Sequence, residues 1–265
     1  MKVAAIQMVS TADLANNLAA ATTLLKKASD DGAKLLVLPE YWPLMGLNDT
    51  DKLALAEQAG TGVIQNFLSE NARTNNVWIV GGTLPLVSCD TKKVFNTTLV
   101  YNPQGVAVVR YDKIHLFGFN KGQESYEESR TIVAGEKVAT FETDVGRVGL
   151  SICYDLRFPE LYRAMGVCSL IVVPAAFTFT TGQAHWEILL RARAIENQCY
   201  VLAAAQGGQH SNGRRTWGHS MLIDPWGKII DVLDDGEGVV TGVVDMLLMQ
   251  QIRESLPALK HQKLC

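Results

Sequence analysis

The sequence predicts an α/β fold with two mixed β-sheets at its core and helices on the outside. Short apolar runs of strand length alternate along the chain with longer amphipathic segments of helix length. Some neighbouring strands are joined by tight turns and others by helices, so hairpins and crossovers occur in one chain. A purely parallel, doubly wound sheet would lack the hairpins, and a pair of mixed sheets therefore fits the pattern better.

The first half of the chain opens with a predicted strand at Val3–Gln7 and a predicted helix at Leu14–Ser29, which Gly32 ends. Leu35–Leu38 is a continuous apolar run, typical of a strand buried on both faces. The further elements of this half are a helix at Val63–Arg73, a strand at Val77–Val80, and a hairpin formed by Phe95–Tyr101 and Val106–Tyr111.

In the second half, a predicted strand at Val145–Cys153 leads into a helix that opens near Pro159. Ala184–Asn197 is predicted to be helical and is apolar on more than one face, which is typical of a helix between layers or in an oligomer interface. The remaining predicted strands are Ser169–Val173, Tyr200–Ala205, Gly218–Ile223, Lys228–Val232 and Val239–Val244.

The bulk properties indicate one globular domain over residues 1–265, because no repeat, linker or low-complexity segment divides the chain. The net charge of −3, with both signs interspersed, lacks the basic face that a nucleic-acid partner requires. We interpret the pair Arg214-Arg215 as solvated surface. No apolar run reaches the roughly 18 residues of a membrane span, and the N-terminus does not resemble a signal peptide.

The cysteines indicate a reducing, cytoplasmic location. Their odd number and the lack of CxxC spacing argue against a disulfide framework and against a zinc site. We expect Cys168 and Cys199 in the core, and Cys89 and Cys265 in a loop and the tail. The fifth cysteine, Cys153, differs from these four in its position at the end of a predicted strand.

Cys153 lies where an alternating strand runs into a polar turn and then a helix. A nucleophile at such an elbow faces the substrate beside backbone N–H groups that can stabilise an oxyanion. Taken alone, the position is equally consistent with a buried structural thiol. A free cysteine has a pKa of about 8.5, so a nucleophilic Cys153 also needs a base or a cation nearby.

Two charged residues follow other predicted strands. Glu40 comes directly after Leu35–Leu38 and Pro39, where a carboxylate would emerge from a buried strand into a cleft. Lys113 follows Val106–Tyr111, and it is either a snorkelling surface residue or a cation positioned for an oxyanion. By contrast Ser220, in a segment that lacks the second glycine of a serine-hydrolase elbow, is interpreted as an ordinary strand residue.

Three blocks occur in order along the chain: Leu38-Pro39-Glu40, Tyr111-Asp112-Lys113-Ile114-His115-Leu116, and Ile152-Cys153-Tyr154-Asp155-Leu156-Arg157-Phe158-Pro159-Glu160-Leu161. Together they resemble the signature blocks of the nitrilase superfamily, the carbon–nitrogen hydrolases. The resemblance extends over essentially the whole chain, and three ordered blocks are far more specific than one short motif.

This resemblance implies a four-layer α-β-β-α sandwich that pairs into a homodimer. It also implies the roles of the three residues. Glu40 would act as general base, Cys153 would form a thioester with the amide carbon, and Lys113 with the backbone N–H of Tyr154 would stabilise the oxyanion. No metal and no organic cofactor is implied, and the expected partner is a small-molecule amide substrate.

Members of the superfamily carry a second glutamate between the lysine and a downstream glycine. The matching segment here contains two candidates, Glu127 and Glu128, ahead of Gly135. We expect Glu128 to take this role, because the pair Glu128-Ser129 matches better, and Glu127 is the fallback.

The second half of the chain resembles the branch of the superfamily that contains deaminated-glutathione amidase and omega-amidase. Both act on 2-oxo acids with an amide at the far end and release 2-oxoglutarate. Arg157 is expected to hold the substrate carboxylate with two parallel hydrogen bonds. Phe177 and Thr181 occupy positions that line the pocket in related enzymes, although core packing also explains Phe177.

Two histidines require separate interpretation. His185 lies near the start of a predicted helix, and Cys–His pairs act in another class of thiol hydrolases. A structural role is favoured for His185, because Glu40 already takes the position of the base. His115 is expected to orient the loop that carries Lys113.

The expected activity is hydrolysis of deaminated glutathione to 2-oxoglutarate and Cys-Gly through a cysteine thioester. The first alternative is an omega-amidase acting on 2-oxoglutaramate, which differs only in the room beyond the scissile nitrogen. The alternative of another class is a catalytically silent binding or scaffold protein with the same fold. An intact set of Glu40, Lys113 and Cys153 argues against the silent protein.

Overall fold

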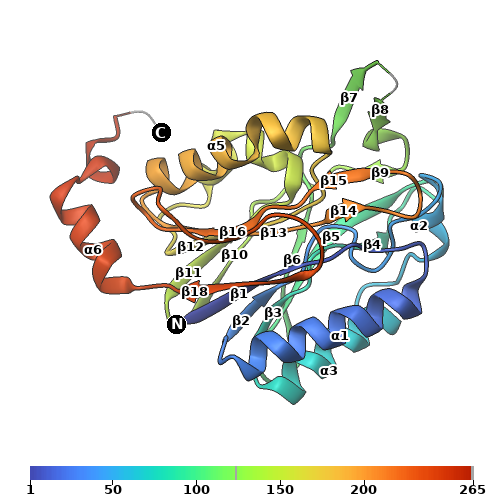
Figure 1. Ribbon diagram of the computed structural model, residues 1–265, viewed down its shortest axis with the longest axis horizontal. Coiled ribbons are helices and arrows are strands. Elements are labelled where there is room, and N and C mark those ends of the chain that lie inside the picture. The colour runs from blue at the N-terminus through green and yellow to red at the C-terminus, as the bar shows by residue number, and fades with distance from the viewer. Residues whose placement is uncertain (123, 264–265) are drawn as a thin grey trace.

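The computed structural model describes residues 1–122 and 124–263, so Cys265 lies outside the described residues. Two β-sheets face each other, α1 and α3 cover the outer face of the first sheet, and α5 covers the outer face of the second (Figure 1). The α/β, four-layer α-β-β-α sandwich expected from the sequence is therefore confirmed.

The first sheet has eight strands, with the order β18-β1-β2-β3-β5-β4, and β6 and β9 also pair with β5. The strand β1 pairs in parallel with β2 and antiparallel with β18, so the sheet is mixed. Its strands are β1 (Lys2–Gln7), β2 (Leu35–Val37), β3 (Trp78–Val80), β4 (Leu84–Val87), β5 (Val94–Tyr101), β6 (Ala107–Asp112), β9 (Ile132–Val133) and β18 (Gly238–Val243).

The second sheet has six strands in the order β10-β11-β12-β13-β16-β17 and is also mixed. Its strands are β10 (Thr140–Thr143), β11 (Gly146–Leu150), β12 (Leu170–Ala175), β13 (Tyr200–Ala205), β16 (Ser220–Ile223) and β17 (Ile229–Leu233). Two hairpins lie outside both sheets, namely β7 (Gly118–Lys121) with β8 (Glu124–Glu127), and β14 (Gly207–Gln209) with β15 (Arg215–Trp217).

Several helices begin at a residue whose side chain accepts a hydrogen bond from the first turn. The Asp13 carboxylate accepts a hydrogen bond from the backbone N–H of Asn16 at 3.0 Å and caps α1. The α-helices are α1 (Leu14–Asp30), α2 (Asp51–Ala54), α3 (Val63–Asn75), α4 (Pro159–Ala164), α5 (Phe179–Asn197) and α6 (Met246–Ser255). Short 3-10 helices span Glu128–Arg130, Cys153–Arg157 and Ala258–His261.

The alternation of side chains in β1 explains how the sheets pack. Val3 and Ala5 are fully buried in the core between the two sheets. Ala4 and Ile6 point the other way, into a second core formed with α1 and α3. Because both faces of β1 and β2 are covered, Val3–Ile6 of β1 and all three residues of β2 are apolar.

The structure corrects the predicted bounds in two places that matter for the site. The strand β11 ends at Leu150, and Cys153 starts a 3-10 helix instead of ending the strand. Helix α5 begins at Phe179, five residues earlier than predicted, because Thr178 caps it. Thr181 therefore lies in the first turn of α5.

Among the described residues, none of the helices combines the length and the apolar character needed to cross a membrane.

Candidate active site

The structure brings Glu40, Lys113 and Cys153 together between the two sheets. Glu40 follows β2, Lys113 follows β6, and Cys153 lies three residues beyond β11. The Lys113 Nζ atom lies 2.9 Å from Glu40 Oε1, and both side chains are fully buried. Burial raises the pKa of the Cys153 thiol and the Glu40 charge raises it further, so the two groups are neighbours. Residues from both sheets thus form one contact network at the end of these strands.

The Glu40 carboxylate is held by two further donors. Its Oε1 accepts from Asn96 Nδ2 at 3.0 Å, and its Oε2 accepts from the backbone N–H of Ala176 at 3.0 Å. The neighbouring Gly82 has a φ of +56°, and a Cβ there would lie 2.2 Å from the carbonyl oxygen of Pro39. A side chain at Gly82 would therefore displace the segment that carries Glu40.

Glu128 completes the network on the far side of Lys113. Its carboxylate oxygens lie 2.7 and 2.9 Å from Lys113 Nζ. The Tyr41 hydroxyl and the backbone N–H of Phe117 each donate to it at 2.7 Å. Glu127, the alternative residue, is exposed and pairs with Arg130 at 2.7 Å. The geometry therefore favours Glu128 over Glu127, and Glu40, Lys113, Glu128 and Cys153 are called the central cluster below.

Burial and charge shift the pKa values of the central cluster. Desolvation raises the pKa of Glu40 above its ordinary range, against the attraction of Lys113 and with the repulsion of Glu128. Burial alone would lower the pKa of Lys113, but Glu128 and Glu40 together raise it. Burial would raise the pKa of Glu128, but Lys113 outweighs burial and lowers it. Lys113 is therefore a charged lysine at neutral pH.

The pKa of the Cys153 thiol is raised well above its ordinary value, because burial and the Glu40 charge outweigh the attraction of Lys113. The thiol is consequently neutral at pH 7, and a nearby cation alone does not ionise it. Proton transfer to Glu40 is the route to a thiolate that the geometry offers.

The backbone at Cys153 lies in the left-handed region, with a φ of +48°. This conformation is unfavourable for a residue with a side chain, and it is stabilised by contacts around it. The buried Asp155 carboxylate accepts from the backbone N–H of Ile152 at 2.9 Å and from the Tyr111 hydroxyl at 2.7 Å. It also accepts from the backbone N–H of His115 at 3.0 Å. Asp155 therefore ties the turn at Cys153 to the segment around Lys113.

His115 lies where a residue orienting the Lys113 loop is expected. Its Nδ1 is 2.7 Å from Asp155 Oδ1, and its ring stacks on Phe158 with 3.7 Å between ring centroids. His185 is exposed on α5, and its Nδ1 lies 3.2 Å from Arg157 Nη1. Neither histidine is hydrogen-bonded to Cys153.

A small pocket opens directly beside Cys153, and all the substrate-binding residues expected from the sequence line it. It is called the inner pocket, and its lining residues are Phe117, Cys153, Tyr154, Arg157, Ala176, Phe177, Thr178 and Thr181. The Arg157 guanidinium lies over the rings of Tyr154 and Phe177, at 5.6 and 5.4 Å from their centroids. The inner pocket thus pairs one cation with apolar walls.

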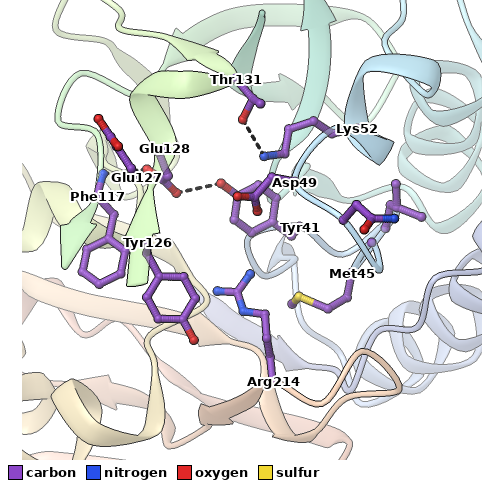
Figure 2. Close-up of a pocket in the computed structure, with 13 residues that line it drawn as sticks. Tyr41, Met45, Asp49, Lys52, Phe117, Tyr126, Glu127, Glu128, Thr131 and Arg214 are labelled. Atoms are coloured by element: carbon purple, nitrogen blue, oxygen red, sulfur yellow. Dashed lines mark hydrogen bonds between the residues drawn. The ribbon is translucent and has the colours of Figure 1, made fainter. Parts of the chain in front are cut away.

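A larger pocket adjoins the central cluster on the side of Glu128 (Figure 2). It is called the outer pocket, and it is lined by Tyr41, Leu44, Met45, Gly46, Asn48, Asp49, Lys52, Phe117, Tyr126, Glu127, Glu128, Thr131 and Arg214. Cys153 does not line the outer pocket, but Phe117 lines both pockets, so the two pockets meet at this residue.

The outer pocket corrects the interpretation of Arg214. This residue is half-buried and faces the pocket, whereas its neighbour Arg215 is exposed, as expected of solvated surface. Lys52 and Tyr41 also line the outer pocket, and neither was predicted from the sequence. The only local signal for Tyr41 is its position next to Glu40, and nothing in the periodicity around Lys52 distinguishes it from a surface residue.

The sandwich and the central cluster together define a hydrolase of the nitrilase type, with Cys153 as its candidate nucleophile. The family model described as carbon-nitrogen hydrolase matches residues 2–254. The chain therefore belongs to the carbon–nitrogen hydrolase family, as the sequence blocks indicated, and it is a hydrolase that acts on carbon–nitrogen bonds other than peptide bonds.

Individual relatives cover nearly the whole chain. A protein of Yersinia enterocolitica named deaminated glutathione amidase is 41% identical over 98% of this chain and 92% of its own length. A zebrafish (Danio rerio) protein named omega-amidase NIT2 is 36% identical over 99% of this chain and 94% of its own. The solved structure of Saccharomyces cerevisiae Nit3, described as a member of branch 10 of the nitrilase superfamily, is 30% identical, has a TM-score of 0.86, and covers 97% of this chain and 94% of its own.

Proposed function

We propose that this protein hydrolyses the amide of a 2-oxo acid through a thioester on Cys153, and that deaminated glutathione is its substrate. The observation that carries the proposal is the buried ion pair of Glu40 and Lys113 next to Cys153, which lines a pocket that contains Arg157. The products would be 2-oxoglutarate and Cys-Gly. The relative named deaminated glutathione amidase, at 41% identity, supports this choice of substrate.

In the first half-reaction, Cys153 Sγ attacks the amide carbon while the thiol proton passes to Glu40. The carbonyl electron pair moves to the oxygen and forms a tetrahedral oxyanion. When the oxyanion collapses, the carbon–nitrogen bond breaks and Glu40 returns its proton to the leaving amine. The acyl group remains on Cys153 as a thioester, and the raised pKa of Glu40 suits a group that both accepts and donates this proton.

In the second half-reaction, a water molecule attacks the thioester carbon and gives one proton to Glu40. The carbon–sulfur bond then breaks, the acid is released, and the proton held by Glu40 returns to the Cys153 sulfur. One water is consumed for each amide cleaved, and the residues end in their starting protonation states.

Lys113 and the backbone N–H of Tyr154 are the proposed donors to the oxyanion. Lys113 is charged and lies 2.9 Å from Glu40, so it sits beside the reacting atoms. Glu128 would act through Lys113, because its two oxygens fix the orientation of the ammonium group. Donors held in place before the reaction stabilise the developing charge without reorganisation.

Arg157 is the proposed anchor for the carboxylate of the 2-oxo acid. Its guanidinium lies in the inner pocket, where a bidentate contact with a carboxylate is geometrically suitable. Phe177 would form the apolar wall, although it also packs on Trp186 with 4.7 Å between ring centroids. Thr181 would contribute its hydroxyl, which lies 2.9 Å from that of Thr178.

An omega-amidase acting on 2-oxoglutaramate is the second candidate, favoured by the zebrafish relative at 36% identity. It would use the same residues and release ammonia. The experiment is to measure 2-oxoglutarate release from deaminated glutathione and from 2-oxoglutaramate, for the wild type and for Cys153→Ala.

A preference for deaminated glutathione that disappears in the variant is the expected result. Faster turnover of 2-oxoglutaramate would transfer the assignment to omega-amidase and leave the mechanism intact. Release from neither substrate would contradict the substrate assignment. Activity that survives in Cys153→Ala would contradict the role of the thiol.

We infer that the protein works as a homodimer in a reducing compartment such as the cytoplasm. Helix α5 keeps Ile188 and Ile195 69% and 48% exposed on its outer side, where a second copy would cover them. Cys89, Cys168 and Cys199 are free thiols, which is consistent with a reducing location.

A further inference from the structure

The outer pocket contains two cations, Lys52 and Arg214, that form no ion pair with any described residue. Within the part of the chain that the structure describes, no carboxylate lies within 4 Å of the charged atoms of Lys52 or Arg214. Lys52 Nζ donates to Thr131 Oγ1 at 3.0 Å and keeps two N–H donors for another partner. The Arg214 guanidinium lies 5.0 Å from the centroid of the Tyr126 ring. Figure 2 shows both side chains reaching toward the pocket from different sides.

Among the described residues, no carboxylate of this pocket forms an ion pair with either cation. Glu128 is paired with Lys113 at 2.7 Å, and Glu127 is paired with Arg130 at the same distance. Asp49 is exposed and stands beyond ion-pair distance of either cation. Burial has the largest effect on the pKa of Lys52 and lowers it; the charges of Asp49 and Glu128 raise it, and the charge of Arg214 lowers it, so the two cations are close enough to repel each other. Such a pair is stabilised when an anion binds between its members.

Phe117 is shared by the two pockets, and Arg157 lines only the inner one. The inner pocket, with Arg157, takes the acyl part of the substrate in the proposed function. A substrate bound across Cys153 would then direct its leaving group past Phe117, Tyr41 and Glu128 into the outer pocket. The site therefore has cations at both ends, and a substrate with a carboxylate at each end matches this arrangement.

We propose that the outer pocket binds the leaving-group side of the substrate, and that Lys52 and Arg214 hold a carboxylate there. The inference rests on the proposed function and names the part of the substrate that each pocket takes. A leaving group of two amino-acid residues spans at most about 7 Å and ends in a carboxylate, as Cys-Gly does. Ammonia, the leaving group of 2-oxoglutaramate, has nothing to place in the outer pocket, so this pocket determines specificity between the two substrates.

The test replaces each cation by methionine, as Lys52→Met, Arg214→Met and the double variant. The measured quantity is the ratio of kcat/KM for deaminated glutathione to kcat/KM for 2-oxoglutaramate. We expect this ratio to fall about tenfold or more in each single variant, mainly through KM for deaminated glutathione, and further in the double variant. Arg215→Met is the matched control, because Arg215 lies outside the pocket over the Phe179 ring, and it should keep the wild-type ratio.

A second measurement separates anion binding from a packing defect. Deaminated glutathione whose glycine carboxylate is capped as an amide should be turned over by the wild type with about tenfold lower kcat/KM. The double variant should no longer distinguish the capped from the free substrate.

Three results would overturn the inference. The first is an equal loss of kcat/KM for both substrates in the variants, which would leave the proposed function standing. The second is a double variant that still prefers the free carboxylate. The third is a wild type that releases 2-oxoglutarate from neither substrate, and in that case the proposed function falls as well.

Discussion

At the scale of single residues, the chemistry of the central cluster depends on which of its residues holds the proton. Lys113 carries one positive charge between the carboxylates of Glu40 and Glu128, and Cys153 holds a proton that Glu40 must receive. Glu40 can receive it only when its own carboxyl is deprotonated. The rate should therefore depend on pH through the raised pKa of Glu40.

Glu128→Gln should shift this pH dependence. The charge of Glu128 raises the pKa of Glu40, so its removal lowers that pKa and Glu40 ionises at lower pH. The rising, acidic limb of kcat/KM against pH should move down by about one pH unit. The plateau should also fall by about tenfold or more, since Lys113 loses its ion pair and one of its two contacts with Glu128.

Glu127→Gln is the control for this shift, because Glu127 is exposed and contacts Arg130 instead of Lys113. Its acidic limb should remain at the wild-type pH. An upward shift in Glu128→Gln, or the same shift in both variants, would contradict the account of the central cluster.

At the scale of secondary-structure elements, the site depends on one carboxylate that joins the two sheets. Asp155, on the turn after β11, accepts hydrogen bonds from Tyr111 and His115 on either side of Lys113. It also accepts from Ile152 next to Cys153. Because β6 belongs to the first sheet and β11 to the second, Asp155 sets the spacing between Lys113 and Cys153.

Asp155→Asn should separate these two elements. An amide oxygen cannot serve all the donors that the carboxylate satisfies, and a buried donor left unpaired is costly. We expect the free energy of unfolding to fall by about 3 kcal/mol. We also expect kcat and the rate of Cys153 alkylation to fall by about tenfold or more, measured where the variant is fully folded.

Asp224→Asn provides a matched comparison. Asp224 is also buried and accepts backbone hydrogen bonds from Trp226 and Lys228, each at 2.9 Å, but its turn is remote from Cys153. This variant should keep the wild-type kcat and alkylation rate. If Asp155→Asn loses stability alone, with both rates intact, Asp155 does not position the site.

At this scale the sequence predicted the site better than its surroundings. Glu40 and Lys113 could be identified because each follows an apolar run that is recognisably a strand. The early start of α5 was missed, since Thr178 is one of several threonines and only its side-chain cap identifies it. The outer pocket was missed because Lys52, in the four-residue helix α2, and Arg214, in the β14–β15 connection, lie far apart in the chain.

At the scale of the whole molecule, the outer face of α5 carries apolar side chains that the fold leaves uncovered. Trp186, Leu190 and Ala194 are fully buried against the second sheet, as a helix in an outer layer requires. Ile188 and Ile195 remain exposed on the other side. Packing within the single chain therefore explains the apolar inner face of this helix but not its apolar outer face.

Ile188→Asp combined with Ile195→Asp should dissociate the proposed homodimer. We expect the wild type to sediment at twice the chain mass of 29.0 kDa, and the double variant to sediment as a monomer. Val63→Asp is the control, because Val63 is 61% exposed on α3 in the opposite outer layer and should leave the dimer intact. A wild type that sediments as a monomer would rule out the homodimer.

The pairing of the last strand with the first has a consequence for synthesis on the ribosome. The strand β1 is hydrogen-bonded to β18, about 230 residues further along the chain. At a translation rate of about 5–20 residues per second, β18 is synthesised roughly 10–50 seconds after β1. During that interval β1 is an unprotected edge to which another nascent chain can add a strand. A product truncated before Gly238 keeps this edge permanently, so premature termination yields a chain prone to aggregate instead of a shorter folded protein.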